Sequence, residues 1–448
     1  MISVLGWTAL LAVQGPPVGF NTGYAAKMLC STVFVSHRAP AEALRQDLVL
    51  AAPIPYRVDS ATSSVVAWIP GVESRRAVYR GRLGCVLRPD SSAGPATPTA
   101  ARPKRAPVAT ALWPVGERVD TATLPAGADA ARLWAAMDSA FAEPTPANPR
   151  RTRAIVIAWQ GRIVAERYSP GYDAATPQLG WSMTKSVTNA LVGILVGRGR
   201  LAVDRPAAVP EWKQAGDPRG RIRLDDLMRM SSGLAFDETY SLGPSDVVKD
   251  LFLAPDAGAY AAAMPLSDPI GTRWSYSSGT TNIISRLIRH TIGSDTAYLD
   301  FPRSALFGPL GMQTAVLEPD PSGTFVGSSY MYASARDWAR FGQLYLNDGV
   351  WNEVRILPKG WVRYSTTPSP ADSTGGYGAQ IWVNGVGRSG ARPHPRVPGD
   401  AFFFLGHDQQ NVAVVPSHSL VVVRLGYTPA GGWDLDGFLE QVLGALPR

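Results

Sequence analysis

The clearest pattern along the chain is a set of short apolar runs separated by turn residues. Residues 154–159 and 162–168 form two such runs, and Gln160-Gly161 between them suits a tight hairpin turn. Similar runs lie near the C-terminus and are followed by a segment with helical spacing. These C-terminal segments are the predicted strands 378–384, 401–405, 411–415 and 420–425 and the predicted helix 433–443.

Residues 182 to about 370 have a different pattern, in which helices and loops predominate. Strands at both ends of a helical stretch predict one sheet that is built from distant segments of the chain. The helical stretch would then form a mostly α lobe inserted into that sheet. The expected fold class is therefore α/β (α+β).

The most apolar predicted helix begins near Gly180. Between Ser182 and Gly197, Lys185 is the only charged residue. A helix that is apolar nearly all round is buried, and both burial and the helix dipole disfavour a charged lysine in the first turn. A neutral Lys185 amine can accept the proton of Ser182, one turn earlier, and so activate a nucleophile. Because about one Ser-x-x-Lys arises by chance in a chain this long, an ordinary buried helix is the alternative.

The chain divides into four predicted parts. Residues 1–18 contain an apolar run as long as the core of a signal peptide and too short to span a bilayer, although no basic residue precedes it. Residues 19–88 form an accessory region with strand-like runs at 64–70 and 76–85. A linker rich in proline and alanine at 89–112 and a body at 113–448, long enough for a two-lobed enzyme, follow.

Both cysteines, Cys30 and Cys85, lie in the accessory region. An isolated pair of this kind suggests one disulfide and an oxidising compartment, and two free buried thiols are the alternative. Together with the apolar N-terminus, the pair favours an exported protein, periplasmic or secreted. The N-terminal segment also predicts loose association with a membrane.

Composition narrows the classes of function. Hydrophobic residues make up 45% of the chain and charged residues 18%, as in ordinary soluble proteins. The net charge of +7 comes from scattered arginines rather than from a basic stripe, which argues against nucleic-acid binding. No Gly-x-Ser-x-Gly and no His-x-x-x-His occurs, so neither an α/β-hydrolase nor a zinc hydrolase is indicated. We expect no metal and no organic cofactor.

Two segments resemble motifs of a known superfamily. Ser182-Met183-Thr184-Lys185 is similar to the first motif of the serine β-lactamase and penicillin-recognising superfamily. Ser275-Tyr276-Ser277-Ser278-Gly279 is similar to the Tyr-x-Ser second motif of its class C-like branch, which includes 6-aminohexanoate-oligomer amidases and esterases. The resemblance implies an antiparallel sheet with flanking helices and an inserted α lobe. It also implies catalytic roles for Ser182, Lys185 and Tyr276 and a substrate-binding role for Ser278.

The third motif departs from the family. No Lys-Thr-Gly occurs, and the segment from Gly406 to Gln410 instead resembles the Gly-x-x-Gly-Gln turn of the amidase and esterase relatives. The resemblance implies an oxyanion hole made by the main-chain N–H groups of Ser182 and His407, with Gly406 and His407 contacting substrate. Those relatives usually have glycine where this chain has Gln409. If that position has positive φ, glutamine is strained there by about 1 kcal/mol.

These observations predict a serine hydrolase that cleaves a small ester or amide through an acyl-enzyme on Ser182. Loss of the Lys-Thr-Gly lysine removes a cation for a substrate carboxylate, which favours neutral substrates over penicillins. The alternatives are a D,D-peptidase or β-lactamase, and a ligand sensor on the same fold that does not turn over. The residues implied for the site are Ser182, Lys185, Tyr276, Ser278, Gly406 and His407, with no metal ligand among them.

Overall fold

The structure, a computed structural model, describes most of the chain. The apolar segment 1–18 and nearly all of the predicted linker lie outside the described residues. Within the described part, no helix is long and apolar enough to cross a membrane. The described residues are 19–48, 54–89, 110–120, 124–145, 148–240 and 245–446.

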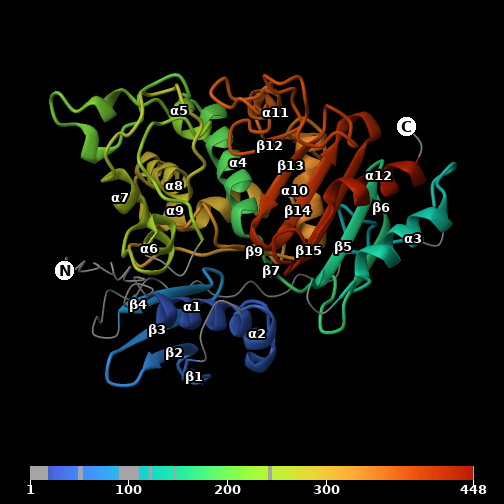
Figure 1. The fold of residues 1–448 in the computed structure, drawn as a ribbon, viewed down its shortest axis with the longest axis horizontal. Helices are drawn as coiled ribbons and strands as arrows, with labels where there is room; N and C mark the ends of the chain where they lie inside the picture. The colour runs from blue at the N-terminus through green and yellow to red at the C-terminus, as the bar shows by residue number, and fades with distance from the viewer. Residues whose placement is uncertain are drawn as a thin grey trace, which may run out of the picture.

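The centre of the fold is an antiparallel sheet of six strands, β5 (Thr152–Trp159), β6 (Arg162–Tyr168), β12 (Trp382–Val383), β13 (Phe402–Gly406), β14 (Gln410–Val415) and β15 (Leu420–Gly426). Their order across the sheet is β12-β13-β14-β15-β5-β6 (Figure 1). The predicted hairpin at Gln160-Gly161 is confirmed, because β5 and β6 pair across it. β15 pairs with β5 and so joins the two ends of the body, residues 113–448.

Helices cover both faces of this sheet. α10 (Ala335–Leu346) packs on one face, and α3 (Ala130–Phe141) and α12 (Leu435–Ala445) pack on the other (Figure 1). Alternate side chains of a strand point to opposite faces, so Val156 of β5 joins the first core and Ile157 the second. The sheet is therefore apolar on both sides, which explains the continuous apolar run of β5.

The predicted α lobe is also confirmed. It lies beside the sheet, and α4 (Thr184–Gly197) runs between the two (Figure 1). Three short strands connect the lobe to the segment before α4: β7 (Gln178–Leu179), β8 (Val316–Leu317) and β9 (Met331–Ala333). The other helices of the central part are α5 (Leu224–Met228), α6 (Asp246–Phe252), α7 (Ala257–Ala262), α8 (Ser278–Ile292), α9 (Asp295–Pro302) and α11 (Trp361–Thr366).

Two predicted strands are wrong in extent. Residues 76–85 are not one strand, because a turn in which Gly81 and Gly84 have positive φ separates β3 (Glu73–Tyr79) from β4 (Cys85–Pro89). Residues 378–384 contribute only β12 to the sheet. Gln380 has φ of 60°, and its N–H donates to the carbonyl of Met228 instead of to a neighbouring strand.

The N-terminal region is a separate small sheet covered by a helix. β1 (Tyr56–Asp59), β2 (Ser64–Ile69), β3 and β4 pair in sequence order, and α1 (Phe20–Phe34) packs on them; α2 (Pro40–Gln46) follows α1. The sequence pattern did not predict α1. A disulfide between Cys30 and Cys85 links α1 to β4, and α1 also packs against α6 of the lobe.

A buried ion pair joins this region to the body of the protein. Lys27 of α1 is 2% exposed and contacts the carboxylate of Glu318, which is fully buried. Glu318 also accepts hydrogen bonds from the Ser31 hydroxyl at 2.8 Å and from the Cys85 N–H at 2.6 Å. The Lys27 ammonium lies 4.1 Å from the centre of the Tyr330 ring. Removing either charge would leave the other buried without its partner.

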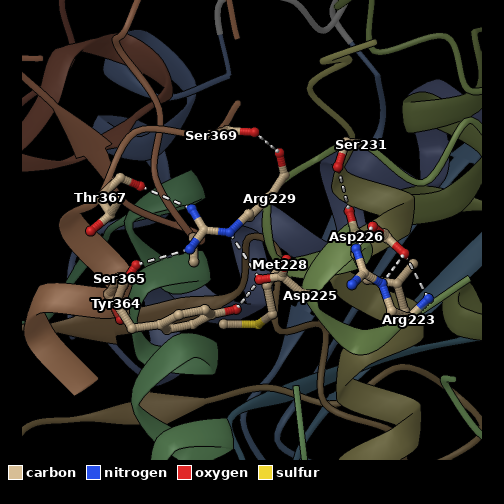
Figure 2. A network of polar contacts seen from close by, with 12 residues as sticks. Arg223, Asp225, Asp226, Met228, Arg229, Ser231, Tyr364, Ser365, Thr367 and Ser369 are labelled. Atoms are coloured by element: carbon tan, nitrogen blue, oxygen red, sulfur yellow. Dashed lines mark hydrogen bonds and ion pairs between the residues drawn. The ribbon is translucent and has the colours of Figure 1, made fainter. Parts of the chain in front are cut away.

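A second polar network fixes the lobe to the segment after α11 (Figure 2). Arg229, which follows α5, pairs with Asp225 at 2.8 Å, and its guanidinium donates to the carbonyls of Thr367 and Tyr364 at 2.9 and 3.3 Å. The Tyr364 hydroxyl donates to the same Asp225 carboxylate at 2.7 Å. The network holds α5 in place. It thereby also fixes the Met228 carbonyl, which accepts the Gln380 N–H.

We predict that Lys27→Met lowers the free energy of unfolding by about 3–5 kcal/mol, because it strands the buried Glu318 carboxylate. The double variant Lys27→Met/Glu318→Gln should recover part of this loss. Denaturant unfolding at pH 7 measures both. Lys359→Met, at an exposed lysine, serves as the control and should change stability by no more than about 0.5 kcal/mol. An equally small effect of Lys27→Met would contradict the assigned role of the pair.

Candidate active site

Ser182 lies in a short 3-10 turn, Trp181–Met183, that leads directly into α4. The predicted helix therefore begins close to Gly180, with a first turn that is wound more tightly than expected. Trp181 has φ of 47°, a left-handed conformation that costs a non-glycine residue about 1–2 kcal/mol. Ser182 is half-buried, whereas Lys185 is only 1% exposed. The nucleophile candidate is thus accessible, and its neighbouring amine is not.

The Lys185 amine has three close oxygen partners. Its Nζ lies 3.1 Å from Ser182 Oγ, 3.0 Å from Ser278 Oγ and 3.2 Å from the Ser328 carbonyl oxygen. A neutral amine has two hydrogens to donate and one lone pair. Ser278 and Ser328 can accept the two hydrogens, which leaves the lone pair for the Ser182 hydroxyl. The partners therefore fit an amine that receives a proton from Ser182.

The protonation of Lys185 is balanced by opposing effects. Burial lowers the pKa of Lys185 to about 8, and the carboxylates of Glu238 and Asp250 act in the opposite direction. A substantial fraction of this lysine is consequently neutral in mildly alkaline solution. An ordinary exposed lysine would be almost fully charged there.

Tyr276 is brought to the same point by the loop before α8. This helix starts at Ser278, and the Ser277 hydroxyl caps it by accepting the Thr280 N–H at 3.0 Å. The Tyr276 ring centre lies 4.7 Å from the Lys185 nitrogen, and the Tyr276 side chain interacts with that of Ser182. Burial and the nearby Glu238 carboxylate raise the pKa of the Tyr276 phenol. Tyr276 is therefore protonated at neutral pH and able to donate.

Two residues of the site were not predicted. Glu238 accepts the Ser278 N–H at 2.7 Å and the Ser278 O–H at 2.6 Å. The Tyr240 side chain interacts with that of Ser278, and its ring stacks on His407 with centroids 4.9 Å apart. No spacing rule ties these residues to Ser182. The only signal in the sequence is an acidic pair, Asp237-Glu238, just before a tyrosine.

The structure also places the Gly406 turn beside the nucleophile. A Cβ added to Gly406 would lie 2.1 Å from the Gly180 carbonyl oxygen, so only glycine allows the end of β13 to approach so closely. The rings of His407 and Trp181 are 5.8 Å apart. Both residues after His407 have positive φ, 58° at Asp408 and 63° at Gln409. The strain expected for a glutamine at this position is therefore present.

The N-terminal region reaches this turn. Phe20 and Tyr24 of α1 line a small apolar pocket together with Trp181, Tyr240 and His407. The pocket brings the accessory region next to Trp181, which precedes the candidate nucleophile, and next to His407, whose N–H is a candidate donor of the oxyanion hole. Three further side chains complete its lining: Val248, Phe252 and Tyr427.

No cluster of three or more histidine, cysteine, aspartate or glutamate side chains arranged to hold a metal ion occurs in the described ranges. The polar groups around Ser182 are instead hydroxyls, one amine and one carboxylate. This donor set suits proton transfer and nucleophilic attack rather than ligation of a metal.

Comparison with known proteins assigns the family. The Beta-lactamase family model matches residues 117–434. The chain belongs to the Beta-lactamase family. A 6-aminohexanoate-dimer hydrolase from Paenarthrobacter ureafaciens is 25% identical to this β-lactamase-family chain over 301 residues, which make up 62% of the chain and 73% of that protein.

Solved structures agree on the fold of this β-lactamase-family chain. A protein from Bacillus anthracis, provisionally assigned as a 6-aminohexanoate-dimer hydrolase, aligns with a TM-score of 0.57 at 23% identity and covers 74% of this chain and 89% of its own. A family VIII carboxylesterase aligns with a TM-score of 0.54 at 15% identity and covers 70% and 96%. The chain is thus a serine hydrolase of the β-lactamase-like superfamily, whose members include amidases and esterases. The accessory region lies outside the family match.

Proposed function

We propose that this protein hydrolyses a neutral ester or amide through an acyl-enzyme on Ser182, with Lys185 and Tyr276 as the proton-transferring pair. The observation that carries the proposal is the Lys185 amine, buried and 3.1 Å from Ser182 Oγ. Its other two oxygen partners leave the lone pair directed at the Ser182 hydroxyl. The disulfide between Cys30 and Cys85 supports export to an oxidising compartment.

In the proposed reaction, Ser182 Oγ attacks the substrate carbonyl while its proton passes to Lys185. The main-chain N–H groups of Ser182 and His407 hold the negative oxygen of the tetrahedral intermediate. Tyr276, whose side chain interacts with that of Ser182, donates its proton to the leaving alcohol or amine and is reprotonated from Lys185. A water molecule then attacks the acyl-enzyme, gives its proton to the same pair, and releases the acid and free Ser182.

Substrate charge is the next part of the proposal. The turn that replaces Lys-Thr-Gly has an acidic residue, Asp408, two positions after Gly406, and the carboxylate of Glu238 acts on Lys185. These negative groups disfavour a substrate carboxylate. An amide-hydrolysing relative, the 6-aminohexanoate-dimer hydrolase, supports amides as well as esters as substrates.

The first test compares wild type with Ser182→Ala on short-chain nitrophenyl esters and on a fluorophosphonate probe followed by intact mass. We expect hydrolysis to fall by at least about 10³-fold and the covalent adduct to disappear. Ser389→Ala, at an exposed serine, should behave as wild type. Labelling without turnover would favour the sensor, and activity that survives in Ser182→Ala would refute the proposal.

The second test is the pH dependence of kcat/KM for the same esters. Because Lys185 must be neutral to accept a proton and its pKa is lowered to about 8, activity should rise about tenfold per pH unit below pH 8 and level off above it. Lys185→Arg keeps a charged group at all accessible pH values and should lose this rise along with most of the activity. A wild-type rate that does not change between pH 6 and 9 would exclude Lys185 as the base.

The third test concerns substrate charge. Matched phenyl esters of butyrate and of hemisuccinate differ chiefly by one carboxylate, and the neutral ester should have a kcat/KM at least about tenfold higher. A chromogenic cephalosporin tested in parallel addresses the β-lactamase alternative. A clear preference for the carboxylated ester, or rapid opening of the cephalosporin, would overturn the assignment of neutral substrates.

A further inference from the structure

We propose that Glu238 is a positioning residue of this centre, which orients the Ser278 hydroxyl and places a negative charge beside Lys185. The inference rests on the proposed function, in which Lys185 is the base. It is carried by a continuous chain of hydrogen bonds. The Ser278 hydroxyl is 2.6 Å from a Glu238 oxygen and 3.0 Å from the Lys185 nitrogen, which is 3.1 Å from Ser182.

Orientation follows from the number of hydrogens in this chain. Ser278 has one hydroxyl hydrogen, and the main-chain N–H of the same residue donates to the second oxygen of Glu238 at 2.7 Å. A carboxylate can only accept, so it fixes the Ser278 hydrogen toward itself. The Ser278 lone pair then faces Lys185 and accepts one of its hydrogens. An amide at position 238 would instead present N–H to one of these two donors.

The charge of Glu238 acts on the same lysine. Lys185 and Glu238 both contact the Ser278 hydroxyl. Opposite charges this close together change the pKa of each group by about 1–3. Of the two carboxylates that act on Lys185, Glu238 has the larger effect on its pKa. Burial raises the pKa of Asp250 well above its usual range, which favours its neutral form. Burial also raises the pKa of Glu238, but the Lys185 charge and the two Ser278 hydrogen bonds oppose that rise and favour the carboxylate. Tyr276 and Tyr240 face the same groups, and burial raises the pKa of both phenols.

This arrangement meets two opposing requirements. Lys185 must be neutral before the attack, and its charged form must be stabilised during the attack. Burial alone would leave Lys185 neutral, with no preference for taking the proton of Ser182. The Glu238 carboxylate stabilises the ammonium that forms during attack, so it lowers the energy of the charged intermediate state. Ser278 connects the two charges without a direct salt bridge that would occupy the lone pair of Lys185.

The kinetic test compares pH profiles of wild type, Glu238→Gln and Glu238→Asp on nitrophenyl butyrate. Removing the negative charge favours neutral Lys185, so in Glu238→Gln the ascending limb of the kcat/KM profile should lie about one pH unit lower. The maximal rate should fall. Glu238→Asp keeps the charge and should keep the position of the limb. Ser278→Ala removes the link but not the charge, so it should lower the rate with little shift of the limb. Glu353→Gln, at an exposed carboxylate, is the control for loss of one charge.

A second readout separates this inference from the proposed function. The chain has six lysines, so selective labelling with [ε-13C]lysine gives few NMR signals, and Lys185→Arg identifies the one of interest. We expect Lys185 to titrate about one unit lower in Glu238→Gln than in wild type, whether or not the ester is a substrate. An unchanged titration together with an unchanged limb would overturn the role of Glu238. If the fluorophosphonate probe forms no adduct on Ser182 in wild type, the proposed function is refuted instead.

Discussion

The burial of one amine is the constraint on which the site depends. Lys185 can approach neutrality only if the first turn of α4 is removed from water, and this requires the sheet on one side of α4 and the α lobe on the other. The same packing brings the Tyr276–Ser278 loop to within 3.0 Å of the amine. The position of α4 between the two layers therefore serves the proposed chemistry as much as stability.

The sequence allowed part of this arrangement to be predicted, and the reasons for success and failure are physical. An apolar helix with a single lysine is a local pattern, so Ser182 and Lys185 could be singled out as candidates from their position at the start of that helix. Tyr276 could be placed only through resemblance, since its approach to Ser182 depends on how the lobe folds back. Glu238 could not be found because its role arises from hydrogen bonds to Ser278, a residue 40 positions away in the chain. Helix α1 was missed for the related reason that it is buried almost all round, with Lys27 satisfied by a distant carboxylate.

The backbone around the candidate oxyanion hole departs from relaxed geometry at three non-glycine residues. Trp181 precedes the nucleophile, and Asp408 and Gln409 follow His407; each has positive φ. Each such residue costs about 1 kcal/mol or more and persists only where the surroundings hold it. Here the surroundings include the close contact of Gly406 with Gly180 and the stacking of Tyr240 on His407. Rigid placement of the two N–H donors is the benefit expected from such strain.

The pairing of β5 with β15 has a consequence for how the protein is made. These two neighbouring strands of the sheet lie far apart in the chain, with the whole α lobe between them. During synthesis β5 emerges early, apolar on both faces, and must wait for β15 before its edge is covered. Long-range pairing of this kind is slow and leaves intermediates prone to aggregation. Because Gly406 and His407 also follow the lobe in the chain, the candidate active site is likewise assembled only after most of the protein has been made.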